Sequence, residues 1–206
     1  MRPRILLACG FLWLAAVVAG TGLMLRFQNT PGRSAEAPPV WPEESRLHRE
    51  PGTSTLILVA HPKCPCLGAS LEELARLLAQ SPARVTAHVV FFKPAEAGDD
   101  WPQTAAWRAA AAIPGVTVST DDAGDQARLF GCETAGDTVF YDARGRLRFH
   151  GGITASRGEA GDNAGRTALD ALLRGESPPQ VRTPVFGCPL LTAGSNAAST
   201  FASWKK

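Results

Sequence analysis

The sequence predicts an α/β protein in which a mixed sheet is flanked by helices and preceded by one N-terminal transmembrane helix. Strand-like and helix-like patterns alternate from residue 53 to residue 175, and such alternation implies β–α–β crossovers. A run of 21 uncharged residues, Ile5 to Leu25, lies near the N-terminus. About 20 apolar residues suffice to cross a bilayer as a helix.

The expected elements follow from periodicity and from helix and strand stop signals. Thr55 to Ala60 is an apolar run typical of a buried strand, and the next segment has apolar residues at helical spacing. Pro94 ends the second strand, and Pro114-Gly115 ends the second helix. The turn Asp142-Ala143-Arg144-Gly145 joins the last two strands as a hairpin. In chain order the predicted elements are strand Thr55–Ala60, helix Leu67–Gln80, strand Arg84–Phe92, helix Gln103–Ala112, strand Val116–Ser119, helix Asp121–Phe130, strand Thr138–Tyr141, strand Arg146–Phe149 and helix Asn163–Leu173.

Four regions are expected along the chain. Residues 1–27 form a membrane anchor or signal sequence, and residues 28–52, rich in proline, form a semi-extended tether. Residues 53–175 form the α/β domain, and residues 176–206 form a C-terminal extension that carries Cys188.

The charges around the N-terminal run predict its orientation. Arg2 and Arg4 precede it and Arg26 follows it, which favours a cytoplasmic N-terminus. A single-pass inner-membrane protein with its domain on the periplasmic or extracytoplasmic side is therefore expected. A cleaved signal peptide is the alternative, since small residues near Ala19-Gly20 offer a weak cleavage site.

Composition and motifs exclude several classes of function. The chain has 206 residues, 45% of them hydrophobic, and a net charge of +2 with no long basic stripe, so no nucleic-acid partner is expected. It contains no P-loop spacing, dinucleotide fingerprint, HExxH or Ser–His–Asp pattern. No nucleotide, hydrolase, metalloprotease or dehydrogenase function is expected.

The most informative motif is His61-Pro62-Lys63-Cys64-Pro65-Cys66, between the first strand and the first domain helix. Thiols do chemistry as thiolates, and a helix N-terminus lowers a cysteine pKa from about 8.5 toward neutrality. This placement points to thiol–disulfide exchange or to soft-metal binding.

We assign Cys64 as an exposed attacking thiolate and Cys66 as the resolving thiol. Side chains at i and i+2 of a helix point in nearly opposite directions, so a Cys64–Cys66 disulfide needs non-helical backbone at Pro65. Lys63, and also His61, would hold the thiolate by charge.

The order of elements, with cysteines after the first strand and a closing strand–strand–helix unit, resembles the thioredoxin-like superfamily. More narrowly it resembles membrane-tethered extracytoplasmic redoxins, over roughly Thr53 to Arg174. The hairpin TVFYDARGRLRFHGG and the final amphipathic helix also carry this resemblance. The family motif is Cys-x-x-Cys, whereas one residue separates the thiols here, and the position of the family's cis-proline is near Gly136.

Two further cysteines have alternative roles. Cys188, between Gly187 and Pro189, is expected as a third redox thiol or metal ligand near Cys64 and Cys66, or in a structural disulfide with Cys132. Cys132 is expected near the site or as a small core residue.

The glycine-rich stretch from His150 to Asn163 is expected to serve turns and caps, with Asp162 or Asn163 capping the final helix. Its length also leaves room for partner recognition.

Three functions fit these features. The favoured one is a membrane-anchored thiol–disulfide oxidoreductase that acts on cysteine-containing extracytoplasmic proteins and needs no cofactor. The second is a copper(I)-binding assembly factor of thioredoxin-like fold, with Cys64, Cys66, Cys188 and His61 as ligands. The third is a catalytically silent interaction scaffold.

Overall fold

A computed structural model describes residues 3–81 and 83–190 and divides the chain into two compact units after Thr30. The first unit is helix α1 (Pro3–Gln28). Its segment Leu7–Gln28 has a mean hydropathy of 2.0 and is long and apolar enough to cross a membrane, a property that signal sequences share.

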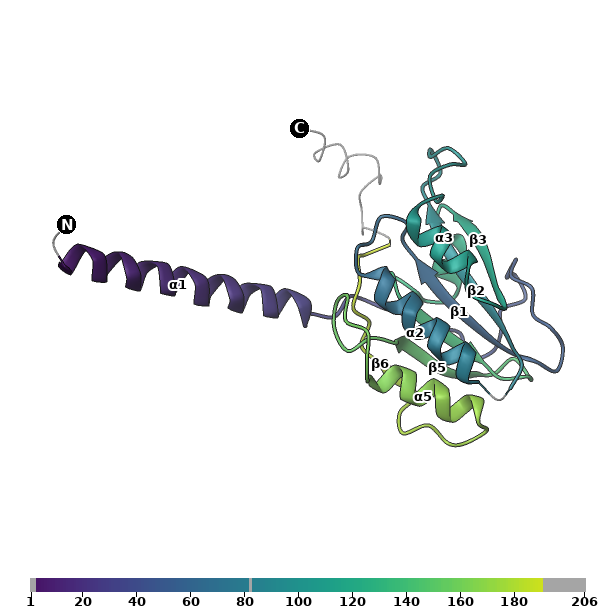
Figure 1. Ribbon diagram of the computed structural model, residues 1–206. Helices are drawn as coiled ribbons and strands as arrows, with labels where there is room; N and C mark the ends of the chain where they lie inside the picture. The colour runs from purple at the N-terminus through teal and green to yellow at the C-terminus, as the bar shows by residue number, and fades with distance from the viewer. Residues whose placement is uncertain (1–2, 82, 191–206) are drawn as a thin grey trace. The chain divides into compact units, whose positions relative to one another are not determined.

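The second unit is built on one six-stranded mixed sheet in the order β3-β2-β1-β4-β5-β6 (Figure 1). The strands are β1 (Ser54–Ala60), β2 (Val85–Lys93), β3 (Val116–Asp122), β4 (Asp137–Tyr141), β5 (Leu147–Gly152) and β6 (Arg182–Thr183). β1, β2 and β3 are mutually parallel, whereas β4 runs antiparallel to both β1 and β5. The strands at the centre are buried on both faces, which is why β1 is apolar throughout from Leu56 to Ala60.

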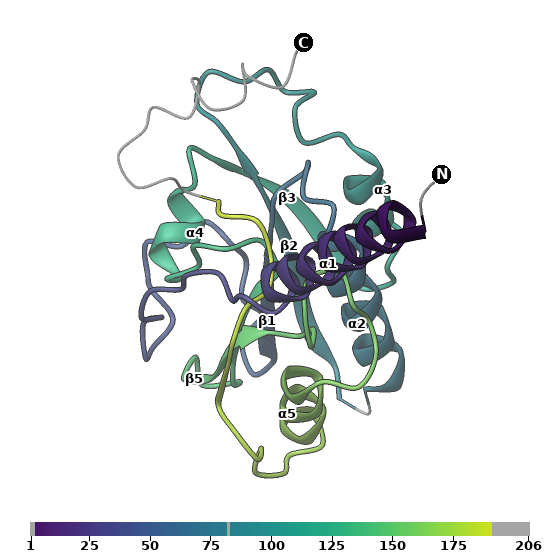
Figure 2. The same ribbon diagram turned by 90° about the vertical axis from the view of Figure 1, so that its left-hand side faces the viewer.

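Helices cover both faces of this sheet. They are α2 (Leu67–Gln80), α3 (Ala105–Ala111), α4 (Asp125–Leu129) and α5 (Ala164–Leu173). Figure 2 shows α3, α2 and α5 stacked on one side of the sheet and α4 on the other. The β1–α2–β2 crossover followed by the β4–β5–α5 unit is the thioredoxin-like fold, as the sequence predicted.

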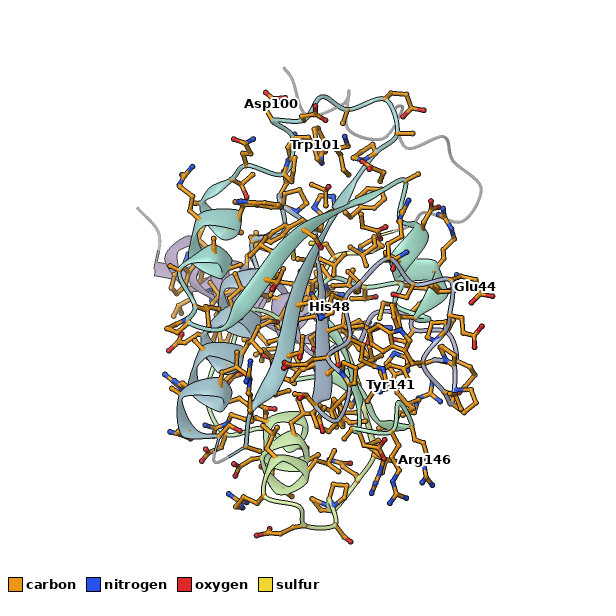
Figure 3. All side chains as sticks on the ribbon, turned by 90° about the vertical axis from the view of Figure 1, so that its right-hand side faces the viewer. Glu44, His48, Asp100, Trp101, Tyr141 and Arg146 are labelled. Carbon is orange, nitrogen blue, oxygen red and sulfur yellow. The ribbon has the colours of Figure 1, made fainter. Side chains whose placement is uncertain are left out.

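Residues 31–52, expected to be a tether, instead pack on the α4 side of the domain. Trp41 makes edge contacts with the rings of Phe130 and Tyr141, at centroid distances of 5.1 and 5.4 Å. The Tyr141 hydroxyl donates a hydrogen bond to the Pro38 carbonyl over 2.9 Å. Figure 3 shows Tyr141 on the same side as Glu44 and His48 of this segment. These contacts hold residues 31–52 against the domain as an extended segment, called the strap below.

Several element boundaries differ from the prediction, and one strand, β6, was not predicted. β3 continues to Asp122, so α4 begins only at Asp125, four residues later than expected. The Asp121 carboxylate still accepts hydrogen bonds from the N–H groups of Gln126 and Ala127, which open this helix. β6 lies in the stretch predicted to be a C-terminal extension, and it forms because Arg182 and Thr183 pair with β5.

Candidate functional site

The Cys-Pro-Cys motif lies in the turn between β1 and α2, as predicted. The N–H of Cys64 donates to the His61 carbonyl, and the N–H of Leu67 donates to the Cys64 carbonyl. Cys66 is the N-cap residue of α2, and its side chain makes no capping bond. The Cys64 sulfur therefore lies where the first N–H groups of the helix have no intrahelical partner.

Cys64 is surrounded by hydrogen-bond donors. The Cys188 thiol makes the strongest contribution, and the backbone N–H groups of Cys188, Cys66 and Leu67 add to it. Together these donors outweigh burial and lower the pKa of Cys64 to about 6. The thiol is thus largely ionised at neutral pH, chiefly through the Cys188 thiol, while the N–H groups at the start of the helix make a smaller contribution than the sequence argument assumed.

The expectation that Cys64 is exposed is wrong, because only 6% of its surface is accessible. The C-terminal segment lies beside it and brings Cys188 into hydrogen-bonding contact. Access of a substrate to the Cys64 sulfur therefore depends on the position of this C-terminal segment.

Backbone pairing fixes the position of Cys188. The Ala135 N–H donates to the Cys188 carbonyl over 2.8 Å, and the Leu190 N–H donates to the Glu133 carbonyl over 2.8 Å. An antiparallel bridge joins Thr134 to Pro189 between these bonds. The tail is thus tied to the loop before β4 by these two hydrogen bonds and the bridge between them.

Cys66 and Cys188 are in the protonated state when Cys64 is ionised. Burial, then the Cys64 charge, raises the pKa of Cys66. The hydrogen bond to Cys64, followed by burial, raises the pKa of Cys188. The three sulfurs interact with one another, so the structure brings together the three predicted site cysteines.

Arg157 is a site residue that the sequence did not single out. Its positive charge lowers the pKa of both Cys66 and Cys188, opposing the effects of burial and of the Cys64 charge. Its Nη1 donates a hydrogen bond to the carbonyl of Gly187, next to Cys188. The glycine-rich loop therefore reaches the cysteines, while Asn163 caps α5 by accepting from the Arg166 N–H, as predicted. The length and polarity of the loop were the only indications in the sequence.

His61 and Lys63 do not hold the Cys64 thiolate by charge, contrary to our expectation. Burial, then the Lys63 charge, lowers the pKa of His61 to about 4, so its ring is neutral at pH 7. That ring stacks on Phe92 at a centroid distance of 6.0 Å. Lys63 Nζ lies 3.5 Å from the centroid of the Trp101 ring, and Figure 3 labels Trp101. The groups that lower the pKa of Cys64 are the Cys188 thiol and backbone N–H groups, not Lys63.

Pro65 and Gly136 have backbone roles at the site. Pro65 is exposed and lies in the turn before α2, where the Leu67 N–H donates to the Cys64 carbonyl and Cys66 already has helical dihedral angles. Gly136 has φ = +90° and donates its N–H to the Val59 carbonyl over 2.8 Å, joining the loop to β1. Glycine suits this left-handed backbone, and the described residues contain no cis peptide bond.

Cys132 lies apart from these three cysteines. It is fully buried, and burial raises its pKa. Its sulfur neighbours Asp137 and His150, whereas Cys188 contacts Cys64. Of the two roles expected for Cys188, the geometry favours the one beside Cys64 over a bond with Cys132.

No protein-family model matches the chain, and no curated protein matches it. Among solved structures, an uncharacterized conserved protein from Geobacillus kaustophilus matches 81% of this chain and 94% of its own, at 22% identity and a TM-score of 0.58. A hypothetical protein, SMc02350 from Sinorhizobium meliloti 1021, matches 80% of this chain and 96% of its own, at 23% identity and a TM-score of 0.56. A secreted disulfide oxidoreductase from Mycobacterium tuberculosis matches 61% and 83%, at 18% identity and a TM-score of 0.43. The first two similarities establish the fold.

Proposed function

We propose that the protein is a membrane-anchored thiol–disulfide oxidoreductase that acts outside the cytoplasm through Cys64. The observation that carries this proposal is a thiol with a pKa of about 6 in hydrogen-bonding contact with a second, protonated thiol. A thiolate is the attacking species in disulfide exchange, and the second thiol completes the exchange.

The reaction has two steps. The Cys64 thiolate attacks one sulfur of a substrate disulfide, which forms a mixed disulfide and releases the other substrate sulfur as a thiolate. Cys188 then loses its proton to that thiolate and attacks Cys64. This step releases the second substrate sulfur and leaves a Cys64–Cys188 disulfide. The substrate disulfide gains two electrons, the protein loses two, and the reverse sequence oxidises a dithiol.

The hydrogen bond between the two sulfurs orders these steps. Cys188 keeps its proton while it donates to the Cys64 thiolate. When Cys64 becomes part of a mixed disulfide, its charge is lost and this cause of the raised pKa disappears. Cys188 then ionises more readily, with Arg157 nearby to stabilise its thiolate.

We favour Cys188 over Cys66 as the resolving thiol, in place of the assignment made from the sequence. A disulfide between residues i and i+2 closes a very small ring, and strained geometry makes such bonds easily reduced. Cys66 is half-exposed beside Cys64 and Cys188. In this proposal it would influence the ionisation of those two thiols without forming a disulfide.

The proposed location is the inner membrane, with α1 as a single-pass anchor and the domain on the periplasmic side. The apolar segment Leu7–Gln28 and the flanking arginines support this orientation. The cysteines would then lie in an oxidising compartment, where disulfides persist and cysteine-containing secreted proteins are the available partners. The exchange uses only the sulfurs of the protein and of its substrate, so the proposed reaction includes no cofactor.

A single-turnover assay tests this function. The reduced full chain in detergent micelles is mixed with a peptide that contains one disulfide, and release of peptide thiols is measured. We expect reduction by the wild type and by Cys9→Ser, a matched control on α1, and loss of at least 100-fold for Cys64→Ser. Equal rates for the Cys64→Ser variant and the wild type would exclude the proposal.

Copper(I) binding is a second candidate, because three sulfurs gather at one place and thiolates are the ligands that Cu(I) prefers. His61 was the fourth expected ligand, and its neutral ring retains the capacity to bind a metal. Titration with Cu(I) against a competing chelator distinguishes the two functions. One tightly bound copper that is lost on Cys66→Ser would favour copper handling, since exchange through Cys64 and Cys188 does not require Cys66.

A further inference from the structure

A second cluster of potential ligands lies apart from the three redox thiols. It consists of Cys132, Asp137 and His150, whose side chains are buried, with 0%, 0% and 4% of their residue surfaces accessible. The Cys132 sulfur, an Asp137 oxygen and a ring nitrogen of His150 all lie within 4.8 Å of one another.

Sheet register explains why two of these side chains meet. His150 in β5 pairs with Val139 in β4, and Asp137 is two residues before Val139. Alternate residues of a strand share a face, so Asp137 and His150 are diagonal neighbours on one face of the sheet. The loop before β4 adds Cys132, whose N–H donates to the Ala127 carbonyl over 2.8 Å.

The polar atoms of this cluster are not satisfied by hydrogen bonds. Asp137 Oδ1 and His150 Nε2 form an ion pair at 3.0 Å, yet neither makes a hydrogen bond of acceptable geometry with any of the described residues. The other oxygen of Asp137, Oδ2, accepts a hydrogen bond from the Ser34 hydroxyl over 2.6 Å. Buried polar atoms without hydrogen bonds are costly, and a bound cation in contact with both would satisfy them.

We propose that Cys132 Sγ, Asp137 Oδ1 and His150 Nε2 bind a zinc ion. Thiolate, carboxylate and imidazole are the ligand types of protein zinc sites. A Zn²⁺ ion with one thiolate, one carboxylate and one neutral imidazole has no net charge, which suits a buried site. This proposal does not depend on the redox function.

The spacing of the ligand atoms fits zinc after small side-chain rotations. Zinc bonds of about 2.0–2.3 Å in a tetrahedral arrangement place ligand atoms roughly 3.3–3.7 Å apart. The widest separation here is no more than 4.8 Å, so closure requires movements of about 1 Å. Ser34 would orient the carboxylate from behind, as groups bonded to metal ligands commonly do. A water molecule would be the fourth ligand.

The ion would brace the loop that holds Cys188. Cys132 and Asp137 bracket the three residues that pair with the tail, Glu133 to Ala135. A metal that joins both ends of this loop to β5 would fix the edge on which the tail rests.

Metal content of the purified full chain tests the proposal. The protein is expressed with zinc in the medium, purified in detergent micelles and unfolded in guanidinium with a zinc-binding dye. We expect one zinc per chain in the wild type and in Cys64→Ser, and less than a tenth of that in Asp137→Asn and His150→Gln. Absence of zinc from the wild type, or its loss in Cys64→Ser, would overturn the proposal.

A spectroscopic measurement covers the case in which the ligand variants fail to fold. The chain has five cysteines, so a variant with serine at the other four keeps Cys132 as its single thiol. Loaded with Co²⁺, this variant is expected to show a thiolate-to-cobalt charge-transfer band and tetrahedral d–d bands. Failure to take up Co²⁺, or uptake without the thiolate band, would contradict the assignment.

Discussion

At the scale of single residues, the defining feature of this protein is the state of Cys64. A buried thiol ordinarily has a raised pKa, because desolvation disfavours its charged form. Here burial acts in that direction and is outweighed by the Cys188 thiol and three backbone N–H groups. The reactivity of Cys64 is therefore a property of its donors rather than of neighbouring positive charges.

Alkylation of Cys64 is expected to titrate with a midpoint near pH 6. The pKa of the folded state lies below the ordinary value, so the thiolate is present above pH 6 and is lost as the pH falls through that value. The rate of reaction with iodoacetamide, followed on the Cys64 peptide by mass spectrometry, measures this midpoint. A midpoint of 8.5 or above would show that the donors do not act as described.

Substitutions at Cys188 separate its role as hydrogen-bond donor to Cys64 from its role as resolving thiol. Cys188→Ala removes the side-chain donor, and we expect the Cys64 midpoint to rise by about 1–2 pH units, the size of one charge-assisted hydrogen bond. Cys188→Ser keeps a hydroxyl donor and should show a smaller rise. Equal midpoints in the wild type and Cys188→Ala would exclude Cys188 as the main stabilising group.

At the scale of elements, α2 is joined to α5 and to the glycine-rich loop by a buried charge. Glu73 is fully buried on α2, and its Oε2 lies 3.0 Å from Nε of Arg166 on α5. Its Oε1 accepts a hydrogen bond from the Gly161 N–H over 2.8 Å. This carboxylate therefore positions the loop that brings Arg157 to the cysteines.

Glu73→Gln is expected to lower the free energy of unfolding by about 3 kcal/mol, because it removes the buried charge that pairs with Arg166 and leaves only the exposed Asp162 as an ionic partner. The neighbouring Glu72 is a matched control. Its side chain is 52% exposed and pairs with Arg76, so Glu72→Gln should change stability by no more than about 0.5 kcal/mol. Urea unfolding of both variants measures the difference, and equal losses would contradict the structural role of Glu73.

Gly187 permits the tail to approach the loop before β4. A Cβ at this position would lie 1.9 Å from the Ala135 carbonyl oxygen and 3.0 Å from its carbon, and both are backbone atoms that cannot easily shift. Gly187→Ala is therefore expected to displace Cys188 and to slow formation of the Cys64–Cys188 disulfide at least 10-fold.

Gly68→Ala is the control for this variant, because a Cβ there meets no atom within 4 Å and alanine favours helix. The rate of disulfide formation under a glutathione buffer, followed by alkylation and mass spectrometry, compares the two. Unchanged kinetics in Gly187→Ala would show that the tail does not need this close approach.

At the scale of the whole molecule, the sequence was sufficient for the fold and for part of the site. The apolar run of β1, the helical spacing of α2 and the hairpin turn at Gly145 each depend on local patterns, and each was predicted. β6 was missed because two residues carry no periodicity and become a strand only by pairing with β5. The strap of residues 31–52 was missed because proline-rich composition is shared by free linkers and by extended segments packed on a domain.

The difference between local sequence patterns and contacts between distant segments also explains which site residues were predicted. Cys64 and Cys66 were found because a strand–cysteine–helix order is visible in the chain. Arg157 was missed because its contact with the Gly187 carbonyl joins segments 30 residues apart. His61 does not supply the expected charge because burial keeps its ring neutral, and the Lys63 ammonium lies over the Trp101 ring; neither placement can be read from their spacing from Cys64.

The apolar α1 helix allows a direct test of the proposed membrane location. We expect the full-length chain to stay with the membrane fraction during alkaline carbonate extraction and to be released by detergent, because a 22-residue span of mean hydropathy 2.0 inserts stably in a bilayer. A soluble, shortened chain in the periplasmic fraction would instead identify a cleaved signal sequence.

The proposed exchange through Cys64 and Cys188 is tested most directly by equilibrating the full chain with glutathione buffers of graded potential and identifying the disulfide that forms. Differential alkylation and mass spectrometry identify the paired cysteines at each potential. We predict one reversible two-electron transition in which Cys64 bonds to Cys188, with Cys66 and Cys132 remaining thiols. A transition that pairs Cys64 with Cys66, or the absence of any bond to Cys64, would contradict it.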